Sequence, residues 1–288
     1  MTTILITGAT RGLGLATAAA ARSRGARVLC AGRDEAAVAS AARRLGADPV
    51  VLDLADLDAV RAVAAELPHV DAVACNAGVQ VLRGPTSTPD GFEETFQVNH
   101  LAHVALLDTL LARTVPPRRL VLVGSATHDP AVRTGTPDAV EHDDLTALAR
   151  AGQDDEPPRT AGVRRYATTK LLAAATAAAL ARERPDVHTT CFDPGLMPGT
   201  GLARQYPAAV RALWSTVLKG ARVLPFASSP AASGRAFAAL LCDEPPPVPT
   251  GSYVDHRLRV VRASTRARDT AYQDSVLRQS RQLLAAAR

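Results

Sequence analysis

Short apolar runs alternate along the chain with longer segments rich in alanine. The runs are nearly continuous in Val, Ile and Leu, which is typical of parallel strands that helices cover on both faces. We predict strands at 3–7, 27–31, 49–53, 70–75, 119–124 and 187–192, and helices near 12–24, 34–45, 56–67, 91–113 and 163–184. Asp34 and Asp56 stand where two of these helices begin, so we expect their side chains to cap them.

This alternation predicts an α/β fold with one Rossmann-type, doubly wound parallel sheet and helices on both faces. Two segments interrupt the pattern. Residues 127–162 are polar, acidic and rich in Pro and Gly, and residues 195–230 place aromatic residues between clusters of Pro and Gly. Both follow strand carboxyl ends, where ligands bind in open α/β sheets. We interpret them as an insertion after the fifth strand and a substrate lid after the sixth, within one domain spanning residues 1–288.

Composition narrows the class of protein. Hydrophobic residues make up 47% of the 288 and aromatic residues only 3%, so we expect a core of Ala, Val and Leu. The longest apolar run, 171–181, is too short to span a bilayer, and the N-terminus has no basic region before its apolar run breaks at Gly8. The sequence therefore predicts no membrane span and no signal peptide, and a cytoplasmic protein. The four cysteines lack metal-ligand spacing, and we expect the three in predicted strands to be buried: Cys30, Cys75 and Cys191, with Cys242 elsewhere.

The net charge of +5 raises the question of nucleic acid, but the basic residues are spread along the chain. One dense set has few aromatic residues between its members, and we interpret it as a solvated face rather than a nucleic-acid surface. Its members are Arg257, Arg259, Arg262, Arg266 and Arg268.

The stretch "LITGATRGLGLAT" places Gly8, Gly12 and Gly14 between the first predicted strand and the first predicted helix. Glycines at that turn let the backbone approach a pyrophosphate, whose negative charge the helix N-terminus favours. A glycine triplet alone is weak evidence, but its position in a repeated strand-helix pattern is the context that dinucleotide binding requires. We therefore expect a dinucleotide site rather than a merely structural glycine turn.

The end of the second predicted strand distinguishes the two nicotinamide cofactors. An acidic residue there binds the adenosine ribose hydroxyls, whereas arginine binds a 2′-phosphate in bidentate geometry. This chain reads "LCAGRDE", with Gly32 at the strand end, Arg33 next, and Arg11 in the glycine loop. Asp34 is the complication, but a carboxylate that caps its own helix points into that helix. The sequence favours NADP(H) over NAD(H), and hence an NADP-binding catalytic domain.

The stretch "YATTK" places Tyr166 and Lys170 four positions apart at the start of the helix predicted over 163–184. This spacing puts both side chains on one helix face. The pair alone is equally consistent with an ordinary aromatic-cation contact, although the chain has only four tyrosines and two lysines. The remaining motifs decide between the two interpretations.

Six short motifs follow one another along the chain: "TGATRGLG" (7–14), "CNAG" (75–78), "VNH" around Asn99, "VGS" ending at Ser125, "YATTK" (166–170) and "DPG" (193–195). With them the chain resembles the short-chain dehydrogenase/reductase family over nearly its whole length. The resemblance implies a nicotinamide cofactor and hydride chemistry that belongs to that cofactor, while the protein supplies orientation and the proton.

The resemblance also implies four catalytic roles. Tyr166 would be the general acid/base, and Lys170 would bind the nicotinamide ribose and lower the pKa of the tyrosine. Ser125 would hydrogen-bond the substrate oxygen, and Asn99 would anchor a water in the proton relay. Elementary chemistry agrees, because a free tyrosine has a pKa of about 10 and a neighbouring ammonium or oxidised nicotinamide favours its phenolate.

The resemblance further implies the residues that hold the cofactor. Asp53 would contact the adenine. The threonine that usually follows "PG" arrives one position late, at Thr200, and its contact with the cofactor stays open. The residues expected to bind the cofactor, or to stabilise the sheet beside it, are Thr7, Gly8, Thr10, Arg11, Gly12, Leu13, Gly14, Arg33, Asp53, Leu54, Asn76, Ala77, Gly78, Tyr166, Lys170, Pro194, Gly195, Leu196 and Thr200.

More narrowly, "VNHLAHVALL", "DPGLMPGTGL" and "GSYVDHRLRVVRAS" resemble the branch that holds retinol dehydrogenases, protochlorophyllide reductases and bacterial polyketide ketoreductases. We therefore expect NADPH-dependent reduction of a ketone or aldehyde to an alcohol, on an apolar or polyketide-like small molecule. Ser125 and Tyr166 are 41 positions apart, more than in most members, so we expect the insertion to reshape the substrate mouth. The lid offers apolar side chains for such a substrate: Leu196, Met197, Leu202, Trp214, Leu218 and Phe226.

Two other site chemistries are weaker. Ser125 with His128 and Asp129 suggests the catalytic triad of a hydrolase. However, the Gly-x-Ser-x-Gly elbow is absent, and residues so close in sequence do not readily form a triad. The His-Asp-Asp run at 142–144 raises a metal, but it lies in an acidic polar segment and is expected to be solvated, so no metal site is predicted.

Three questions stay open at this level. His100 and His103 lie on the Asn99 helix, where we expect ordinary hydrogen-bonded histidines, with contact to the proton relay as the alternative. The helix predicted over 163–184 either pairs subunits, as in many members, to give a homodimer or homotetramer, or packs its alanines on the sheet. The rival function is a catalytically silent NADP-sensing regulatory protein, a class that commonly lacks the tyrosine or the lysine present here.

Overall fold

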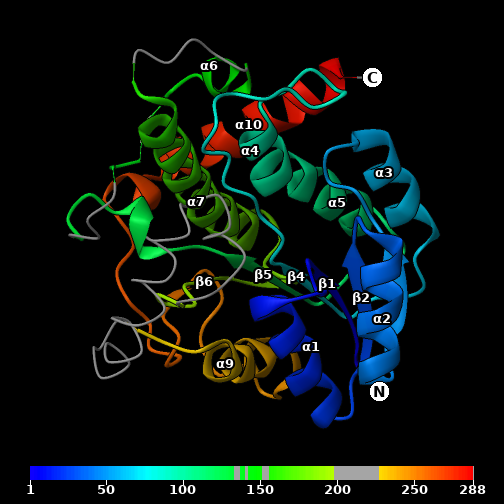
Figure 1. Cartoon of the computed structure of the whole chain (residues 1–288). Helices are drawn as coiled ribbons and strands as arrows, with labels where there is room; N and C mark the ends of the chain where they lie inside the picture. Colours follow the sequence, from blue (N-terminus) through cyan, green and yellow to red (C-terminus); the bar gives the residue numbers. More distant parts are fainter. Residues whose placement is uncertain (133–136, 140–141, 151–155, 198–226, 288) are drawn as a thin grey trace, which may run out of the picture.

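The structure is a computed structural model that describes residues 1–132, 137–139, 142–150, 156–197 and 227–287. A parallel sheet of seven strands lies at the centre, with helices on both faces (Figure 1). In chain order the elements are β1 (Thr3–Thr7), α1 (Gly12–Ser23), β2 (Arg27–Gly32), α2 (Glu35–Leu45), β3 (Asp48–Val51), α3 (Leu57–Glu66), β4 (Ala72–Cys75), α4 (Glu94–Phe96), η1 (Gln97–Leu101), α5 (Ala102–Leu111), β5 (Arg119–Val123), η2 (Ala126–His128), α6 (Leu145–Ala149), α7 (Pro158–Glu183), β6 (His188–Phe192), α9 (Pro230–Cys242), β7 (Tyr253–Val254), η5 (Arg266–Arg268) and α10 (Thr270–Ala286).

The strand order is β3-β2-β1-β4-β5-β6-β7, and all neighbouring strands are parallel. The chain moves outward from β1 to β3, then returns to β4 beside β1 and moves outward in the other direction. This doubly wound order opens a crevice at the carboxyl ends of β1 and β4, where the order reverses. The predicted Rossmann-type fold is confirmed.

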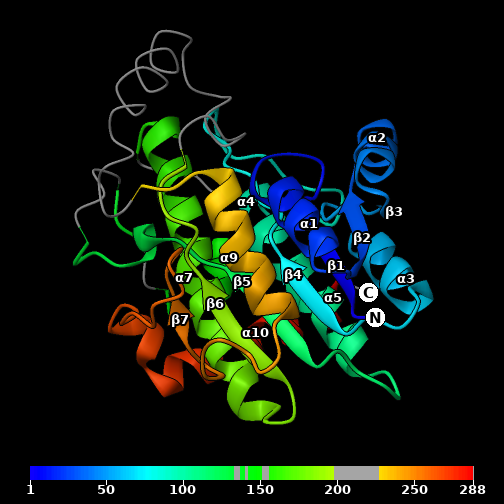
Figure 2. The ribbon, with the colours of Figure 1, turned by 90° about the horizontal axis from the view of Figure 1, so that it is seen from below.

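The strand side chains alternate between two hydrophobic cores. Leu5 and Leu120 contribute to the core shared with α3, α5, α7 and α10. Ile4, Ile6 and Val121 contribute to the core shared with α1, α2 and α9. Figure 2 shows α1 and α9 side by side over one face of the sheet. The inner strands are therefore buried on both faces, which is why nearly every position in them is apolar.

The third strand differs from its prediction. It begins one residue earlier than predicted, at Asp48, and ends at Val51. Its residues alternate between half-buried and exposed, and Val51 is 49% exposed. The reason is its place at the edge of the sheet, where helices do not cover both faces, and an apolar run in the sequence cannot show this.

Both predicted helix caps are confirmed. Asp34 Oδ1 accepts a hydrogen bond from the Ala37 amide, and Asp56 Oδ1 accepts one from the Ala59 amide, each at 2.9 Å. These bonds satisfy amides that have no partner within the helix. The helix predicted over 163–184 begins earlier, at Pro158, a residue whose fixed φ suits the first turn.

The helix predicted near 91–113 is divided. It consists of the short α4, the π-helical turn η1 and the regular α5. The hydrophobic pattern cannot reveal such a turn, because one extra residue per turn barely changes the spacing of apolar positions. Isolated π turns inside helices occur frequently at functional sites, and this one contains Asn99.

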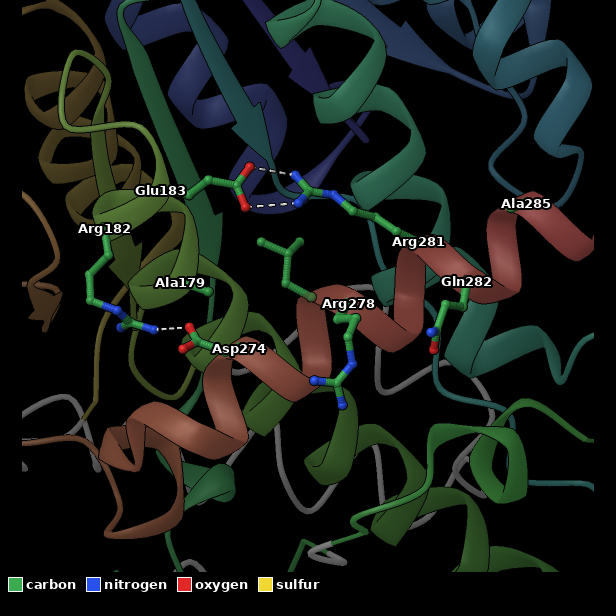
Figure 3. Close-up of a pocket in the computed structure, with 9 residues that line it drawn as sticks. Ala179, Arg182, Glu183, Asp274, Arg278, Arg281, Gln282 and Ala285 are labelled. Atoms are coloured by element: carbon green, nitrogen blue, oxygen red, sulfur yellow. Dashed lines mark hydrogen bonds and ion pairs between the residues drawn. The ribbon is translucent and has the colours of Figure 1, made fainter.

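The C-terminal helix α10, which the sequence pattern does not predict, packs on α7 and α5. Arg281 of α10 donates to Asp108 of α5 and to Glu183 of α7, each at 2.8 Å. Figure 3 shows the Arg281–Glu183 and Arg182–Asp274 pairs that join α10 to α7. Between α7 and α10 these ion pairs line a groove of about 620 Å³. The groove lies along the second half of α7, beyond Lys170, where α10 packs on this helix.

One segment of the predicted insertion, residues 143–149, is docked on α10. Gln279 accepts a hydrogen bond from the Leu145 amide at 3.0 Å and donates to the Asp143 carbonyl at 2.7 Å. Leu145 itself is fully buried. Most of the predicted lid, residues 198–226, lies outside the described residues, as do Thr200 and the lid residues Leu202, Trp214, Leu218 and Phe226.

Cys30, Cys75 and Cys191 are free thiols buried in β2, β4 and β6, which confirms their predicted place in the core. Among the helices of the described ranges, none combines the length and the apolar character needed to cross a bilayer.

His100 is a buried polar group that links η1 to α10. Its Nε2 lies 2.7 Å from Ser280 Oγ, and that hydroxyl donates to the Val276 carbonyl. His100 Nε2 therefore carries a proton that it donates to Ser280. Burial lowers the pKa of His100 to about 3, so the ring is neutral in the folded protein.

We expect acid to destabilise the fold through this histidine. The unfolded chain protonates a histidine below pH about 6.5, whereas folded His100 stays neutral to a much lower pH. Because its folded pKa is lowered, stability is lost as the pH falls through the unfolded value, by about 2 kcal/mol between pH 7 and pH 5. In urea unfolding, His100→Gln should remove about that part of the loss. The same substitution at the more exposed His69 is the control, and an unchanged loss in His100→Gln would contradict the assignment.

Candidate active site

The glycine loop joins β1 to α1 by a sharp turn and a close approach. Gly8 and Gly12 have φ angles of +67° and +55°, where glycine is favoured. A Cβ on Gly14 would lie 2.3 Å from the Gly8 carbonyl oxygen and 2.6 Å from Asn76 Nδ2, so only glycine fits there. Leu13, between Gly12 and Gly14, is buried in the core that α1 covers. The close approach at Gly14 brings the N-terminus of α1 against the loop, and this turn fits the pyrophosphate of a dinucleotide.

Thr7 and Asn76 tie the carboxyl ends of β1 and β4 together. Asn76 Nδ2 donates to the Thr7 carbonyl at 2.7 Å. The amides of Asn76 and Ala77 each donate to Thr7 Oγ1 at 2.9 Å. The crevice where the strand order reverses is therefore held by hydrogen bonds from both sides.

Gly32 and Thr10 bring the end of β2 against the glycine loop. A Cβ on Gly32 would lie 3.2 Å from Thr10 Cγ2. Arg33 follows Gly32, and Arg11 follows Thr10. Both arginines are exposed and branch from this corner. As predicted, the Asp34 carboxylate is turned onto its own helix, where it accepts from the Ala37 amide. The corner thus carries the exposed side chains of Arg11 and Arg33, and the Asp34 carboxylate is occupied as a cap.

Asp53 and Leu54 follow β3. Asp53 Oδ1 accepts a hydrogen bond from the Ala55 amide at 2.9 Å, which fixes the carboxylate at the strand end. Leu54 is buried in the core. The adenine contact that the resemblance implies for Asp53 stays a prediction.

Ser125 comes directly after Gly124 at the end of β5 and caps the short turn η2. Its Oγ accepts hydrogen bonds from the Thr127 amide at 3.3 Å and from Thr127 Oγ1 at 3.1 Å. A hydroxyl that accepts twice still has its own proton to donate. Ser125 is therefore set up as a hydrogen-bond donor to a substrate oxygen.

Tyr166 and Lys170 lie on one face of α7, as predicted, with Lys170 Nζ 5.2 Å from the centre of the Tyr166 ring. Lys170 is only 5% exposed, and its Nζ donates to the Val123 carbonyl of β5 at 2.9 Å. Helix α7 also packs against η2, the turn that carries Ser125. The structure thus brings the expected serine, tyrosine and lysine to the carboxyl end of β5.

The protonation of this pair differs from the expectation. Burial lowers the pKa of Lys170 to about 8, and the Asp193 carboxylate opposes that change. Burial raises the pKa of Tyr166, and the charge of Asp193 raises it further. This direction is opposite to the lowering expected from the neighbouring ammonium, because burial removes the phenolate from water. Tyr166 accordingly holds its proton at neutral pH.

Asn99 joins η1 to two other segments. Its Oδ1 accepts from the Val79 amide at 2.7 Å, and its Nδ2 donates to the Val79 carbonyl and to Thr169 Oγ1 at 2.9 and 3.1 Å. A Cβ on Gly78 would lie 3.2 Å from Asn99 Oδ1, so glycine permits this approach. The Asn99 side chain thus connects the "CNAG" segment to the helix that carries Tyr166.

His103 is the histidine that reaches this network. Its Nδ1 lies 3.2 Å from the Asn99 carbonyl, and its Nε2 lies 3.0 Å from Thr7 Oγ1. Burial lowers its pKa to about 4, so the neutral ring donates from one nitrogen and accepts at the other. Both histidines are ordinary hydrogen-bonded groups, as predicted, and His103 contacts the main-chain carbonyl of Asn99. A part for His103 in a proton relay stays a prediction.

The end of β6 lies beside Ser125, since the Gly124 amide donates to the Phe192 carbonyl at 2.8 Å. Asp193 Oδ1 accepts from the Gly195 amide at 2.9 Å, and Gly195 has a φ of +71°. Two further candidates differ in burial: Pro194 is buried, with its carbonyl bonded to Ser233 of α9, and Leu196 is 39% exposed.

The weaker site chemistries find no support. His128 Nδ1 contacts the main-chain carbonyl of Ser125 at 2.7 Å, and the hydroxyl is engaged with the neighbouring threonine instead, so no triad forms. Asp143 pairs with Arg266, and Asp144 caps α6. Over the part of the chain that the structure describes, no group of three or more His, Cys, Asp or Glu side chains is arranged to hold a metal.

Thr127 and Asp193 are the site residues that sequence reasoning missed. Thr127 follows Ser125 by two positions, the spacing of a serine or threonine turn, and this was its available signal. Asp193 stands inside the quoted "DPG" motif, yet the motif does not show that the charge of its carboxylate acts on Tyr166 and Lys170.

Comparison with known proteins agrees with this geometry. The sequence profile of the family described as short chain dehydrogenase matches residues 2–127, from the glycine loop to the turn after Ser125. A protochlorophyllide reductase of Avena sativa is 34% identical over 239 residues, which cover 73% of this chain and 76% of that protein. A Streptomyces sp. (strain C5) protein assigned as daunorubicin C-13 ketoreductase DnrU is 37% identical over 203 residues, 67% of this chain and 65% of that protein.

Solved structures share the fold over most of the chain. An uncharacterized protein from Mycobacterium paratuberculosis has a TM-score of 0.72 and 26% identity, over 99% of this chain and 94% of that one. A protein from Beutenbergia cavernae, described as an NAD(P)-dependent gluconate 5-dehydrogenase with NADP bound at low occupancy, has a TM-score of 0.63 and 25% identity, over 88% and 94% of the two chains. The chain belongs to the short-chain dehydrogenase family.

Proposed function

We propose that this chain is an NADPH-dependent oxidoreductase that reduces a ketone or aldehyde to an alcohol. The observation that carries the proposal is the convergence of Ser125, Tyr166 and Lys170 at the carboxyl end of β5, with the glycine loop two strands away. A hydroxyl donor, a half-buried phenol and a buried ammonium are the groups that an oxygen needs as it gains negative charge and then a proton.

Each of the three side chains has a distinct task. The Ser125 hydroxyl, held by Thr127, donates to the carbonyl oxygen of the substrate. The Tyr166 phenol gives its proton to that oxygen, and its raised pKa keeps the proton available at neutral pH. NADPH, when bound, supplies the hydride that reaches the carbonyl carbon. Lys170 provides a positive charge within 5.2 Å of the ring, which favours the phenolate left behind.

The choice of NADP(H) is supported by the corner formed by the glycine loop and the end of β2. Arg11 and Arg33 are exposed there, and a guanidinium binds a phosphate through two parallel hydrogen bonds. The Asp34 carboxylate, which would otherwise repel a 2′-phosphate, is bonded to the Ala37 amide. NADP is also the cofactor named for the Beutenbergia cavernae structure.

The proposed substrate is an apolar or polyketide-like carbonyl compound. The names of two relatives, a daunorubicin ketoreductase and a protochlorophyllide reductase, point to large ring systems. Leu196, the exposed apolar residue after "DPG", is available to such a substrate at the mouth. If the enzyme is a homodimer or homotetramer, we propose that it pairs through a surface other than the second half of α7, which α10 covers.

The first test concerns the cofactor. We expect NADPH to bind at least about tenfold more tightly than NADH, or about 1.4 kcal/mol. Arg33→Ala should remove most of this preference while it leaves NADH affinity unchanged, because NADH has no 2′-phosphate. Fluorescence titration with both cofactors measures the ratio, and Arg43→Ala, an exposed arginine of α2, is the matched control. Equal affinities in the parent protein would rule out the assignment.

The second test concerns the proton donor. Tyr166→Phe should reduce turnover of an apolar ketone by about 10² or more, with NADPH affinity nearly unchanged because the ring still packs. Lys170→Ala should weaken both, since the resemblance places that ammonium on the ribose as well as beside the phenol. As a control, Tyr272→Phe makes the same change at a buried tyrosine of α10 and should keep the parent turnover. A Tyr166→Phe enzyme that reduces the ketone at the parent rate would refute the mechanism, and a parent that binds NADPH without turnover would indicate the NADP-sensing alternative.

A further inference from the structure

His128 lies directly behind the candidate serine and is only 2% exposed. Its Nδ1 lies 2.7 Å from the Ser125 main-chain carbonyl, which also accepts from the His128 amide at 3.1 Å. The imidazole thus closes the turn η2 on the serine side. No catalytic role described above uses this ring.

The other ring nitrogen joins the turn to a distant part of the chain. The Ser264 amide donates to His128 Nε2 at 3.1 Å, across 136 positions of sequence. Ser264 is itself 3% exposed, and it accepts from the Ala267 amide through Oγ and from the Arg268 amide through its carbonyl. The ring of Tyr253 packs against the imidazole with centroids 4.8 Å apart. His128 is therefore held by the segment that leads into α10.

The two partners fix the tautomer of the ring. A main-chain amide can only donate, so Nε2 carries no proton and accepts from Ser264. A neutral imidazole then has its proton on Nδ1, which donates to the Ser125 carbonyl. Burial also lowers the pKa of His128, which keeps the ring neutral. With Nε2 occupied by an amide, the ring has no lone pair left to take a proton from the serine hydroxyl.

The turn that His128 closes also orients the serine hydroxyl. Thr127, the residue just before His128, donates to Ser125 Oγ from both its amide and its hydroxyl. If the Ser125 main chain turns, these donors and the hydroxyl move together. A displacement of about 1 Å in a group that contacts the reacting atoms is enough to cost up to 10²-fold in rate.

We propose that His128 is a positioning residue for the carbonyl reduction, which holds the Ser125 main chain through Nδ1–H and anchors that turn to Ser264 through Nε2. The inference rests on the proposed function of Ser125. It assigns to the C-terminal segment a part in setting the serine geometry, although that segment contributes no group to the chemistry itself.

Two conservative substitutions separate the two contacts of the ring. His128→Asn places an amide N–H where Nδ1 lies and cannot reach Ser264, whereas His128→Gln places a carbonyl oxygen where Nε2 lies and lacks the donor to Ser125. We expect His128→Asn, which keeps the contact with Ser125 and loses the anchor to Ser264, to lose about threefold in kcat, and His128→Gln and His128→Ala to lose about tenfold. KM and NADPH affinity should change by less than about twofold, since neither ligand touches the ring. Equal kcat in the Asn and Gln variants would overturn the proposal.

A double-mutant cycle shows whether the effect passes through the serine. In a Ser125→Ala background, His128→Gln should lower kcat by no more than about twofold, because the hydroxyl that it positions is gone. A full additional loss of about tenfold would mean that His128 acts by another route and would overturn the proposal. His188→Asn, which also removes an imidazole bonded to a main-chain carbonyl but at the opposite end of β6, should match the parent.

One readout does not depend on turnover. In nitrogen-15 NMR at neutral pH, the His128 ring, assigned by its loss in His128→Asn, should be the neutral Nδ1–H tautomer. A proton on Nε2, or a charged ring, would overturn the contact and the proposal with it. The two proposals can therefore fail separately. A parent protein without turnover contradicts the proposed function, whereas the wrong tautomer contradicts the role of His128.

Discussion

A buried positive charge sets the geometry of the candidate active site. The Lys170 ammonium lies inside the protein, where removal from water is costly, and its pKa is lowered to about 8 as a result. Its hydrogen bond to the Val123 carbonyl and the nearby charge of Asp193 offset part of that cost. The bond also fixes α7 against the end of β5. Since Tyr166 lies one turn earlier on the same helix face, the position of the ammonium determines where the phenol lies relative to Ser125.

The surrounding hydrogen bonds all hold segments at the same edge of the sheet. Thr7 and Asn76 join β1 to β4, Asn99 joins η1 to the segment after β4 and to α7, and His128 joins the turn after β5 to Ser264. The parallel order places these strand ends together, so residues far apart in sequence meet in one crevice. The helix α10 supports that arrangement from outside through Arg281, which bonds to both α5 and α7.

The sequence predicts best where a physical requirement leaves few residue types. Strands β1, β2 and β5 lie inside the sheet and are rich in Val, Ile and Leu, and all six predicted strands exist, with β3 shifted because it is an edge. The place of Gly14 in the glycine loop could be predicted because only glycine avoids a collision with the Gly8 carbonyl there. By contrast, β7 is only two residues long, and α10 mixes polar residues with apolar ones, so neither stood out. The π turn at Asn99 differs from a regular helix in its main-chain hydrogen bonds, and the amino-acid sequence carries no pattern that indicates it.

For the site, sequence motifs supplied the residue types but not their protonation. The "YATTK" spacing correctly predicted a shared helix face, whereas the direction of the Tyr166 pKa shift depended on burial, which no motif records. His128 looked like part of a weak triad because of its place near Ser125. Its actual partner, Ser264, comes from a segment 136 positions away, so only the folded chain reveals it.

The central claim is that a hydride passes from NADPH to a carbonyl carbon while Tyr166 protonates the oxygen. The most direct measurement uses NADPH carrying deuterium at both C4 positions of the nicotinamide, incubated with this protein and a series of apolar ketones and aldehydes. Mass spectrometry of the product then locates the label. We predict an alcohol with one deuterium on the carbinol carbon and one NADP+ formed for each alcohol. An alcohol without deuterium, or NADPH bound with no alcohol formed from any member of the series, would contradict it.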